Sequence, residues 1–438
     1  ARPAEVKGDA GVNMNIWQKS GGELLAITSP RDLKKHSGAL NHSSIIVDAL
    51  FGTGLSSPVK GLDAGVIGLI NSLGKKVISV DAPSGIDAST GAVHGAAVKA
   101  DITVTMALPK TGLYMYPARE YAGRIEVAGI GFPEKLVSDA RLRWNITCAK
   151  FVNGVFAPRR PDSHKGAYGH VLVVAGSPGK SGAAYMTALG AMRSGAGLCT
   201  IALPEGLNPA MEAKTIEVMT LLLPETPDGC LGSVSYKKLR PFLDKASSIV
   251  IGPGLGASKE AAFLVEMLLR DASVPLVIDA DGLNVLRGNP RLIRKAKAGV
   301  VITPHPGEAA RLLGINGSDI QSERLVSAER LAGITGAVVV LKGASTIIAD
   351  PSGEVFINPT GNPGLSTAGT GDVLSGMIGA FLGMGIRQLS ASAAAVYIHG
   401  LAADEIKKTT GEAGMLATDL LSQIPAILNS LSAGTQKK

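Results

Sequence analysis

The stretch NPTGNPGLSTAGTGDVLSG, residues 358–376, joins a glycine-rich loop to an apolar helical pattern that continues through Phe381. At such a junction the first backbone N–H groups of the helix are free and the helix dipole adds partial positive charge, so the junction can bind an anion. One carboxylate, Asp372, lies there. It is either the N-cap of the helix, since Asp is a preferred N-cap residue, or a catalytic base.

Short apolar runs separated by helical patterns extend through the rest of the chain. Because these runs are apolar at nearly every position, they indicate parallel strands covered on both faces, and so an α/β protein. The predicted strands are residues 24–27, 45–47, 77–80, 102–104, 170–175, 249–251, 276–278, 300–302 and 338–341. Helical spacing is clearest at residues 9–20, which begin at an Asp cap, and at 65–73 and 183–194.

The length of 438 residues exceeds one ordinary core and predicts two domains. The pattern loosens after Phe132, which places the boundary near residue 140 and predicts domains at 1–140 and 141–438. A hydrophobic content of 45% with 18% charged residues is typical of a folded globular protein and excludes a disordered chain.

The formal charge of +7 is modest for this length, and the basic residues are dispersed. The densest groups, Arg159–Arg160 and Lys437–Lys438, do not form a stripe. We therefore expect phosphorylated small molecules as partners and neither nucleic acid nor membrane.

Three cysteines, Cys148, Cys199 and Cys230, are odd in number and have no metal-like spacing. They predict reduced thiols in a cytoplasmic protein. No apolar run approaches the ~20 residues that span a bilayer, and no signal peptide is visible.

Two predicted strands of the first domain end in polar, glycine-rich turns. They are VDALFGTGLSSPVKG at residues 47–61 and VDAPSGIDASTG at residues 80–91. Each can be an ordinary turn between a strand and a helix. Because both open with Val-Asp at a strand end, a shared pocket is also possible, and its carboxylate, hydroxyl and carbonyl oxygens would suit a hard cation.

Four strand ends of the second domain carry polar residues as well. They are GPGLG at 252–256, DADGLN at 279–284, TPHPGE at 303–308 and KGAST at 342–346. Taken singly, each has a structural explanation, but together they indicate one site at the carboxyl ends of the strands. The segment GSPGKSGAA, residues 176–184, does not meet the P-loop spacing, which excludes that motif.

The two Val-Asp turns, in this order and spacing, resemble the YjeF N-terminal domain, the NAD(P)H-hydrate epimerase. The resemblance implies that Asp48 and Ser84 are potassium ligands and that Asp81 acts on the nicotinamide ring as its acid or base. It also implies that a loop binds the hydrated nucleotide, formed by Gly52, Thr53, Gly54, Leu55, Ser56, Ser57 and Pro58.

The first domain departs from this family at its start. Family members carry, upstream of the match, a strand and a loop of the type NNGGDG, whereas this sequence opens ARPAEVKGDA without Met. We therefore expect a truncated Rossmann-like sheet with impaired epimerase activity, and an exposed sheet flank prone to aggregation.

The motifs GPGLG, DADGLN, TPHPGE, KGAST and the opening stretch resemble the ADP-dependent NAD(P)H-hydrate dehydratase of ribokinase-like fold, over about residues 150 to 430. The two domains together, in this order, resemble the bifunctional NAD(P)H-hydrate repair enzymes. This implies nucleotide-dependent dehydration of the S form of NADH or NADPH hydrate, with the first domain interconverting the R and S forms. It also implies a homo-oligomer.

The second resemblance assigns site residues too. An adenine nucleotide, ADP or ATP, with Mg²⁺ would be held by Lys342, Gly343, Ala344, Ser345, Thr346 and Gly371. The hydrate would contact Ala183, Gly256, His305 and Asp372, with Asp372 as the catalytic base. Glu308 and Asn362 are further candidates.

Nucleotide dependence makes chemical sense because hydroxide is a poor leaving group. Phosphorylation of the ring hydroxyl needs a base on that hydroxyl and fixed positive charge around the transferred group. Two alternatives stay open, a ribokinase-like small-molecule kinase that stops at the phosphoester and a non-catalytic nucleotide-binding protein.

Overall fold

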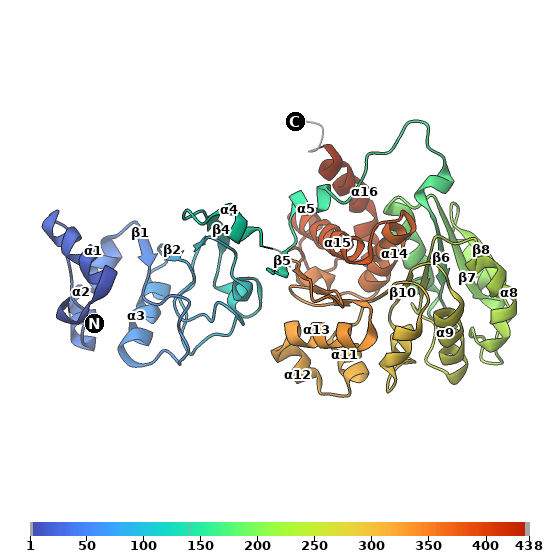
Figure 1. Cartoon of the computed structure of the whole chain (residues 1–438), viewed down its shortest axis with the longest axis horizontal. Helices are drawn as coiled ribbons and strands as arrows, with labels where there is room; N and C mark the ends of the chain where they lie inside the picture. The colour runs from blue at the N-terminus through green and yellow to red at the C-terminus, as the bar shows by residue number, and fades with distance from the viewer. Residues whose placement is uncertain (1–2, 140, 434–438) are drawn as a thin grey trace. The chain divides into compact units, whose positions relative to one another are not determined.

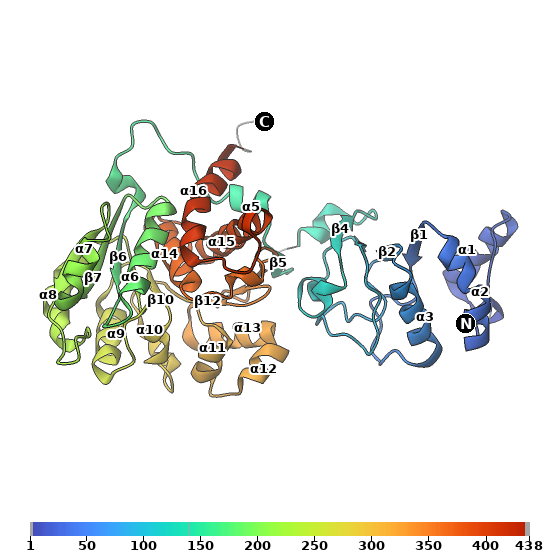
Figure 2. The ribbon, with the colours of Figure 1, turned by 180° about the vertical axis from the view of Figure 1, so that it is seen from behind.

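The computed structural model describes residues 3–139 and 141–433 (Figures 1 and 2). The chain divides into two compact units, Ala1–Leu142 and Arg143–Lys438. The domain boundary predicted from the sequence, after residue 140, lies beside this division. The α/β fold class is confirmed, since both units are built on largely parallel sheets.

The first unit contains a four-stranded parallel sheet in the order β1-β2-β3-β4. In register, Ile46 lies opposite Val77, and Ile78 lies opposite Ile102. The strands are β1 (Ile45–Asp48), β2 (Lys76–Val80), β3 (Ile102–Met106) and β4 (Arg124–Ala128). The helices are α1 (Gly8–Lys19), α2 (Pro30–His42), α3 (Gly61–Ser72) and α4 (Glu134–Val137), with 3-10 turns η1 (Pro3–Glu5), η2 (Thr111–Tyr114) and η3 (Ala118–Glu120).

Two predictions for this unit are wrong. Residues 24–27 are not a strand; they lie in an irregular segment with Leu24 and Leu25 each 40% exposed. A short apolar run forms a strand only where a neighbouring strand accepts its hydrogen bonds, and none does so here among the described residues. Helix α1 begins at Gly8 after Lys7, so Asp9 is not its N-cap.

Strand β1 forms one edge of this sheet. Its side chains alternate, with Ile46 and Asp48 buried and Ile45 and Val47 exposed by 53% and 63%. The buried row directs the Asp48 carboxylate into the unit at the carboxyl end of the strand.

The second unit is built on a ten-stranded sheet in the order β5-β14-β13-β12-β11-β10-β9-β6-β7-β8. All neighbours are parallel except β13, which is antiparallel to both β12 and β14. The strands are β5 (Trp144–Ile146), β6 (His170–Val174), β7 (Leu198–Pro204), β8 (Met219–Leu223), β9 (Ser248–Ile251), β10 (Leu276–Ile278), β11 (Val300–Ile302), β12 (Val338–Leu341), β13 (Ile347–Ala349) and β14 (Val355–Ile357).

Helices cover both faces of this sheet, because β9, β10, β11 and β12 are buried at every position. The helices are α5 (Ala149–Asn153), α6 (Ser181–Arg193), α7 (Asn208–Glu212), α8 (Ser233–Leu243), α9 (Lys259–Asp271), α10 (Asp281–Asn284), α11 (Pro306–Leu313), α12 (Gly317–Ser322), α13 (Arg324–Thr335), α14 (Thr370–Gly383), α15 (Gln388–Thr410) and α16 (Ala417–Ala433). The 3-10 turns are η4 (Lys165–Tyr168), η5 (Glu205–Leu207), η6 (Pro290–Lys295) and η7 (Pro363–Leu365).

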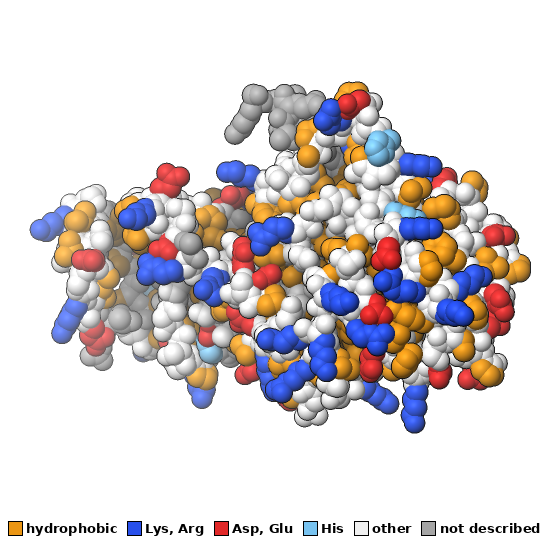
Figure 3. Space-filling model, turned by 45° about the vertical axis from the view of Figure 1, so that its right-hand side comes forward, with side chains coloured by type: hydrophobic (Ala, Val, Ile, Leu, Met, Phe, Trp, Pro, Cys, Tyr) orange, Lys and Arg blue, Asp and Glu red, His pale blue; other side chains and the backbone are white. Residues whose placement is uncertain are grey.

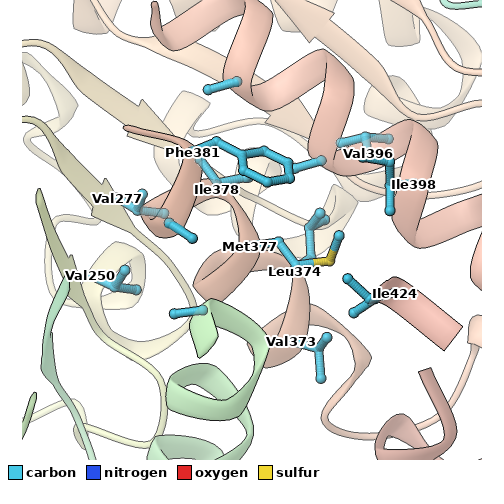
Figure 4. Close-up of a cluster of buried hydrophobic side chains, with 14 of the residues drawn as sticks. Val250, Val277, Val373, Leu374, Met377, Ile378, Phe381, Val396, Ile398 and Ile424 are labelled. Carbon is cyan, nitrogen blue, oxygen red and sulfur yellow. The ribbon is translucent and has the colours of Figure 1, made fainter. Parts of the chain in front are cut away.

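Helix α14 is the centre of the core (Figure 4). Its residues Val373, Met377 and Phe381 are fully buried and pack among side chains of the sheet and of α15 and α16. It approaches α6 closely, since a Cβ at Gly190 of α6 would lie 2.5 Å from the Val373 carbonyl oxygen. This packing fixes the start of α14, which carries Asp372.

The described surface is mixed in character. On the face drawn in Figure 3, Lys and Arg side chains are interspersed with acidic, polar and hydrophobic ones. Among the described helices, none is long and apolar enough to cross a membrane.

Candidate active site

Three strand ends of the second unit meet at the Lys342 ammonium. Lys342 follows β12, and its Nζ donates a hydrogen bond to Asp279 Oδ1, which follows β10, over 2.9 Å. Glu308 Oε2, in the first turn of α11 after β11, lies 4.0 Å from the same nitrogen. Asp279 and Glu308 are buried, at 1% and 4% exposure, so the lysine joins two carboxylates withdrawn from water.

Asp372 stands at the start of α14, but it is not the N-cap. The cap position is Gly369, whose φ of 94° lies in the left-handed region that favours glycine. Asp372 is the third residue of the helix, and the cap makes no side-chain hydrogen bond. The prediction of an N-cap role is therefore wrong, and the carboxylate is free for another task.

The Asp372 carboxyl is tuned to neutral pH. Burial, with the negative charges of Asp279, Asp281 and Glu308, raises its pKa to about 7, although Lys342 acts in the opposite direction. Within the described residues its carboxylate makes no hydrogen bond or ion pair. A desolvated, unpaired carboxyl with a pKa near 7 has the properties of a general base.

The Lys342 ammonium lies beside the start of α14. A Cβ at Gly371 would come 3.3 Å from Lys342 Nζ, so the glycine leaves room for the ammonium. Burial alone would lower the pKa of Lys342, but Asp279 and Glu308 outweigh it and raise the pKa. The lysine therefore stays charged and adds to the positive potential of the helix N-terminus.

His305 is the N-cap of α11. Its Nδ1 accepts hydrogen bonds from the backbone N–H groups of Gly307 (3.0 Å) and Glu308 (3.3 Å), which leaves the proton of the neutral ring on Nε2. Burial and the Lys342 charge lower the pKa of His305. Burial, with Asp279, raises the pKa of Glu308 to about 7. His305 Nε2 lies 3.4 Å from Glu308 Oε1, so the proton on this nitrogen faces the Glu308 carboxyl.

A second ion pair forms another part of the site. Lys180 Nζ donates to Asp281 Oδ2 over 3.0 Å, and the Gly256 N–H donates to the same oxygen over 2.9 Å. Burial would raise the pKa of Asp281, but Lys180 and this N–H hold it below its ordinary value. A Cβ at Gly254 would lie 3.2 Å from Ala183 Cβ, so the Ala183 and Gly256 segments adjoin.

The predicted nucleotide-binding loop, residues 342–346, connects β12 and β13. Gly343 and Ala344 are exposed, and Thr346 Oγ1 donates to the Gly343 carbonyl over 2.9 Å. Arg324 stabilises the start of the loop, because its Nη2 donates hydrogen bonds to the carbonyls of Leu341 (3.2 Å) and Lys342 (3.3 Å). Gly343 and Ala344 therefore leave this loop accessible to solvent. Its role in nucleotide binding stays a prediction, as does that of Gly371.

Several residues of this site were not predicted from the sequence. Lys180 and Arg324 had no motif to mark them, and the pairing of Asp279 with Lys342 spans 63 positions. His399 in α15 holds the start of α14, since its Nε2 donates to the Thr370 carbonyl over 2.9 Å and burial lowers its pKa to about 4. It lies in an apolar helical pattern, which gives no signal of this role.

Asn362, one of the further candidates, has a structural role in the described residues. Its Nδ2 donates to Asp404 Oδ1 over 3.0 Å, and its Oδ1 accepts from the Gly364 N–H over the same distance. These bonds shape the glycine-rich loop before α14.

The first unit brings Asp48 and Ser84 together, as the resemblance implied. Ser84 Oγ donates to Asp48 Oδ1 over 2.6 Å, and Ser79 Oγ donates to Asp48 Oδ2 over 2.7 Å. The Ser84 N–H also donates to Oδ2 over 2.9 Å. Asp48 is 1% exposed, so its carboxyl lies in a buried cluster of oxygens. Its role as a potassium ligand stays a prediction.

Asp81 is held in a strained backbone conformation, with φ at 68°. Its Oδ1 accepts from Lys110 Nζ (2.9 Å) and from the Met106 N–H (3.0 Å). Burial would raise the pKa of Asp81, but these two donors keep it below the ordinary value. Residues 52–58 form a loop without regular structure after β1, exposed except at Leu55.

Across residues 3–139 and 141–433, no three His, Cys, Asp or Glu side chains are grouped in a way that could hold a metal ion.

The sequence of this chain matches two known protein families. Residues 171–426 match the family described as NAD(P)H-hydrate dehydratase, and residues 1–112 match the family described as YjeF-related protein N-terminus. The bifunctional NAD(P)H-hydrate repair enzyme Nnr of Moorella thermoacetica is 43% identical over 98% of this chain and 81% of its own length. The chain belongs to the family of bifunctional NAD(P)H-hydrate repair enzymes.

Further relatives agree with this assignment. The Escherichia coli K12 enzyme of the same description is 36% identical over 96% of this chain and 77% of its own length. The ADP/ATP-dependent NAD(P)H-hydrate dehydratase of Bacillus subtilis, co-crystallised with ATP and Mg²⁺, is 32% identical with a TM-score of 0.58. It matches 66% of this chain and 99% of its own. The ribokinase-like fold and family predicted from the sequence are confirmed, and the small-molecule kinase alternative is not favoured.

Proposed function

We propose that the second unit dehydrates the S form of NADH or NADPH hydrate at the expense of an adenine nucleotide, with Asp372 as the base. The observation that carries this proposal is the Asp372 carboxyl, unpaired, desolvated, with a pKa near 7 and placed in the first turn of α14. That turn offers free N–H groups for phosphoryl oxygens beside the base.

The chemistry proceeds in two balanced stages. Asp372 takes the proton of the ring hydroxyl while the hydroxyl oxygen attacks the terminal phosphorus of the nucleotide, whose bridging oxygen leaves with the shorter nucleotide. The ring nitrogen lone pair then expels the phosphate by cleavage of the carbon–oxygen bond. A neighbouring ring carbon then loses a proton to the released phosphate, which restores the dihydropyridine. Phosphate is a far better leaving group than hydroxide, and this difference explains the nucleotide requirement.

The residues of the site have separate tasks in this scheme. Lys342 and the N–H groups at the start of α14 stabilise the charge on the transferred phosphoryl group. His305 contacts the hydrate, while Ala183 and Gly256 adjoin it. The loop 342–346 holds the nucleotide, and Mg²⁺ enters with its phosphates, because Mg²⁺ in such sites is bound largely by substrate oxygens and water.

For the first unit we propose epimerisation of the hydrate, supported by its match to the YjeF-related family. Asp81 is its acid or base on the nicotinamide ring, with Lys110 as its charge partner. The buried oxygens of Asp48 and Ser84, 2.6 Å apart, are suited to potassium, although each oxygen of the Asp48 carboxyl already accepts hydrogen bonds and the other ligands must come from backbone or water.

The test is a coupled measurement on the full chain. Pure S hydrate is incubated with ADP or ATP, and the absorbance of the restored dihydropyridine is followed together with released phosphate. We expect both to appear in equal amounts. Accumulation of a phosphorylated ring without restored dihydropyridine would instead identify a kinase. Pure R hydrate then tests the first unit. We expect the full chain to consume R hydrate faster than this form epimerises spontaneously.

A further inference from the structure

A cavity lies in the second unit, at the opposite end of α14 from Asp372. It has a volume of about 1670 Å³ and is formed by α5, the ends of α6 and α14, the start of α15, and α16. Met384 directly follows α14 and lines this cavity, whereas Asp372 lies in the first turn of the same helix. A helix of 14 residues is about 20 Å long, so this cavity is separate from the active site.

The lining of the cavity is strongly basic. Its charged residues are Lys150, Arg159, Arg160, Arg193 and Arg387, and the described lining contains no Asp or Glu. Arg160 pairs with Asp162 over 2.8 Å, and Arg159 lies over the Tyr168 ring at 3.9 Å. In the described part of the chain, Lys150, Arg193 and Arg387 have no ion pair or side-chain hydrogen bond.

The start of α15 opens into this cavity without a cap. Arg387 occupies the N-cap position, no side chain caps the helix, and no acidic residue lies in the first turn. An N-cap is ordinarily Ser, Thr, Asp or Asn, and a cation at the positive end of a helix dipole is unfavourable. An anion bound between the free N–H groups and the guanidinium would reverse this cost.

Ser194 supplies an independent sign of a ligand. It is 2% exposed, lines the cavity, and its Oγ has no hydrogen-bond partner. Buried hydroxyls are nearly always paired. Arg193 alone can be explained as a cation in the last turn of α6, where it favours the helix dipole, but this explains neither Arg387 nor the unpaired Ser194.

The rest of the lining is apolar and partly aromatic, with Phe151, Phe156, Met192, Met384 and Leu428. We propose that this cavity is a second, non-catalytic binding site for a nucleoside phosphate. Its phosphate lies at the start of α15 with Arg193, Arg387 and Ser194, and its base lies on the apolar lining. The volume exceeds that of an ordinary small-molecule pocket, so there is room for both parts.

The test counts bound ADP per chain by equilibrium dialysis with labelled ADP on the full-length protein. We expect two ADP per wild-type chain and one in Arg193→Glu/Arg387→Glu, with the dehydratase rate unchanged. The control Lys237→Glu/Lys238→Glu reverses the same charge on exposed residues of α8 and should keep two. One ADP in the wild type, or two in the cavity variant, would overturn the proposal.

A second variant covers the case in which the charge reversals disturb folding. Ser390→Asp places a carboxylate in the first turn of α15, where it favours the helix dipole but repels phosphate. We expect an unchanged or higher melting temperature and at least a tenfold weaker second ADP site. If instead the Arg variant changes the mass of the ligand-free protein in solution, the cavity is an interface between copies and the proposal is wrong.

Discussion

At the scale of single residues, Asp372 determines how the reaction depends on pH. Burial and three neighbouring carboxylates raise its pKa to about 7, so the base is protonated below this value and active above it. We predict that kcat with the S hydrate rises with pH and levels off above about 7. Asp372→Asn should lose about 10²- to 10⁴-fold in kcat while nucleotide binding is kept. A variant that retains most of its rate would exclude Asp372 as the base.

The same raised pKa means that the ionised Asp372 side chain lowers the free energy of unfolding. A carboxyl that binds its proton more tightly in the folded state loses stability as pH rises from about 4 to about 7, and the loss persists above. Asp372→Asn should therefore raise the free energy of unfolding by about 1–3 kcal/mol at pH 8, and by less at pH 5. Urea unfolding at the two pH values measures this difference.

Lys342, in contrast, stabilises the folded protein, because its ammonium group pairs with buried carboxyl groups. Lys342→Met would leave the buried Asp279 side chain without its ion-pair partner, and should destabilise the protein by about 3 kcal/mol as well as weaken nucleotide binding. The double variant Lys342→Met/Asp279→Asn should recover most of the stability but not the nucleotide affinity. If the single variant is as stable as the wild type, the ion pair does not support the site.

These residues also show what a sequence can predict of a site. Asp372 and His305 could be proposed because their motifs are local. The pairings that tune them join distant segments, such as Lys180 to Asp281 over 101 positions. No local pattern predicts such a pair, because it depends on the order of strands in the sheet.

At the scale of elements, the contact between α6 and α14 positions the base. Gly190→Ala would place a Cβ 2.5 Å from the Val373 carbonyl oxygen, next to Asp372 in the chain. We predict a loss of about 1–3 kcal/mol in unfolding free energy and a lower kcat, because α14 must shift. Gly333→Ala in α13 is the matched control.

A Cβ at Gly333 would meet no atom within 4 Å, and the position is exposed. That substitution should be neutral or stabilising by up to about 1 kcal/mol, because alanine favours a helix over glycine. Equal losses in the two variants, measured by urea unfolding, would show that helix packing is not the cause.

The strands also show how much of the secondary structure could be predicted from the sequence. The buried strands β10, β11 and β12 could be predicted because they are apolar at every position, as is β9 after its first residue, Ser248. β13 and β14 were not predicted, although each has three apolar residues as β10 and β11 do, because so short an apolar run does not by itself distinguish a strand from another buried segment. Residues 24–27 have a strand-like composition without a neighbouring strand, and whether a neighbour exists is a property of the fold rather than of the segment.

At the scale of the whole molecule, the division after Leu142 predicts that the second unit folds and works by itself. Its core is complete within residues 143–438, and the solved Bacillus subtilis dehydratase matches this part over 99% of its own length. A fragment of residues 143–438 should dehydrate the S hydrate at the rate of the full chain. It should consume the R hydrate only as fast as that form epimerises spontaneously.

The exact starting point of the fragment matters, because β5, the first strand of the unit, begins at Trp144, next to this boundary. β5 pairs with β14 at the edge of the sheet, and Arg143 donates to the Ser352 carbonyl over 2.8 Å. A fragment that begins at Ala149 would lack β5 and leave the apolar strand β14 as an open edge. We expect it to melt at a lower temperature and to aggregate, while the longer fragment does neither. Equal melting temperatures for the two fragments would show that β5 does not belong to the folded core of the dehydratase unit.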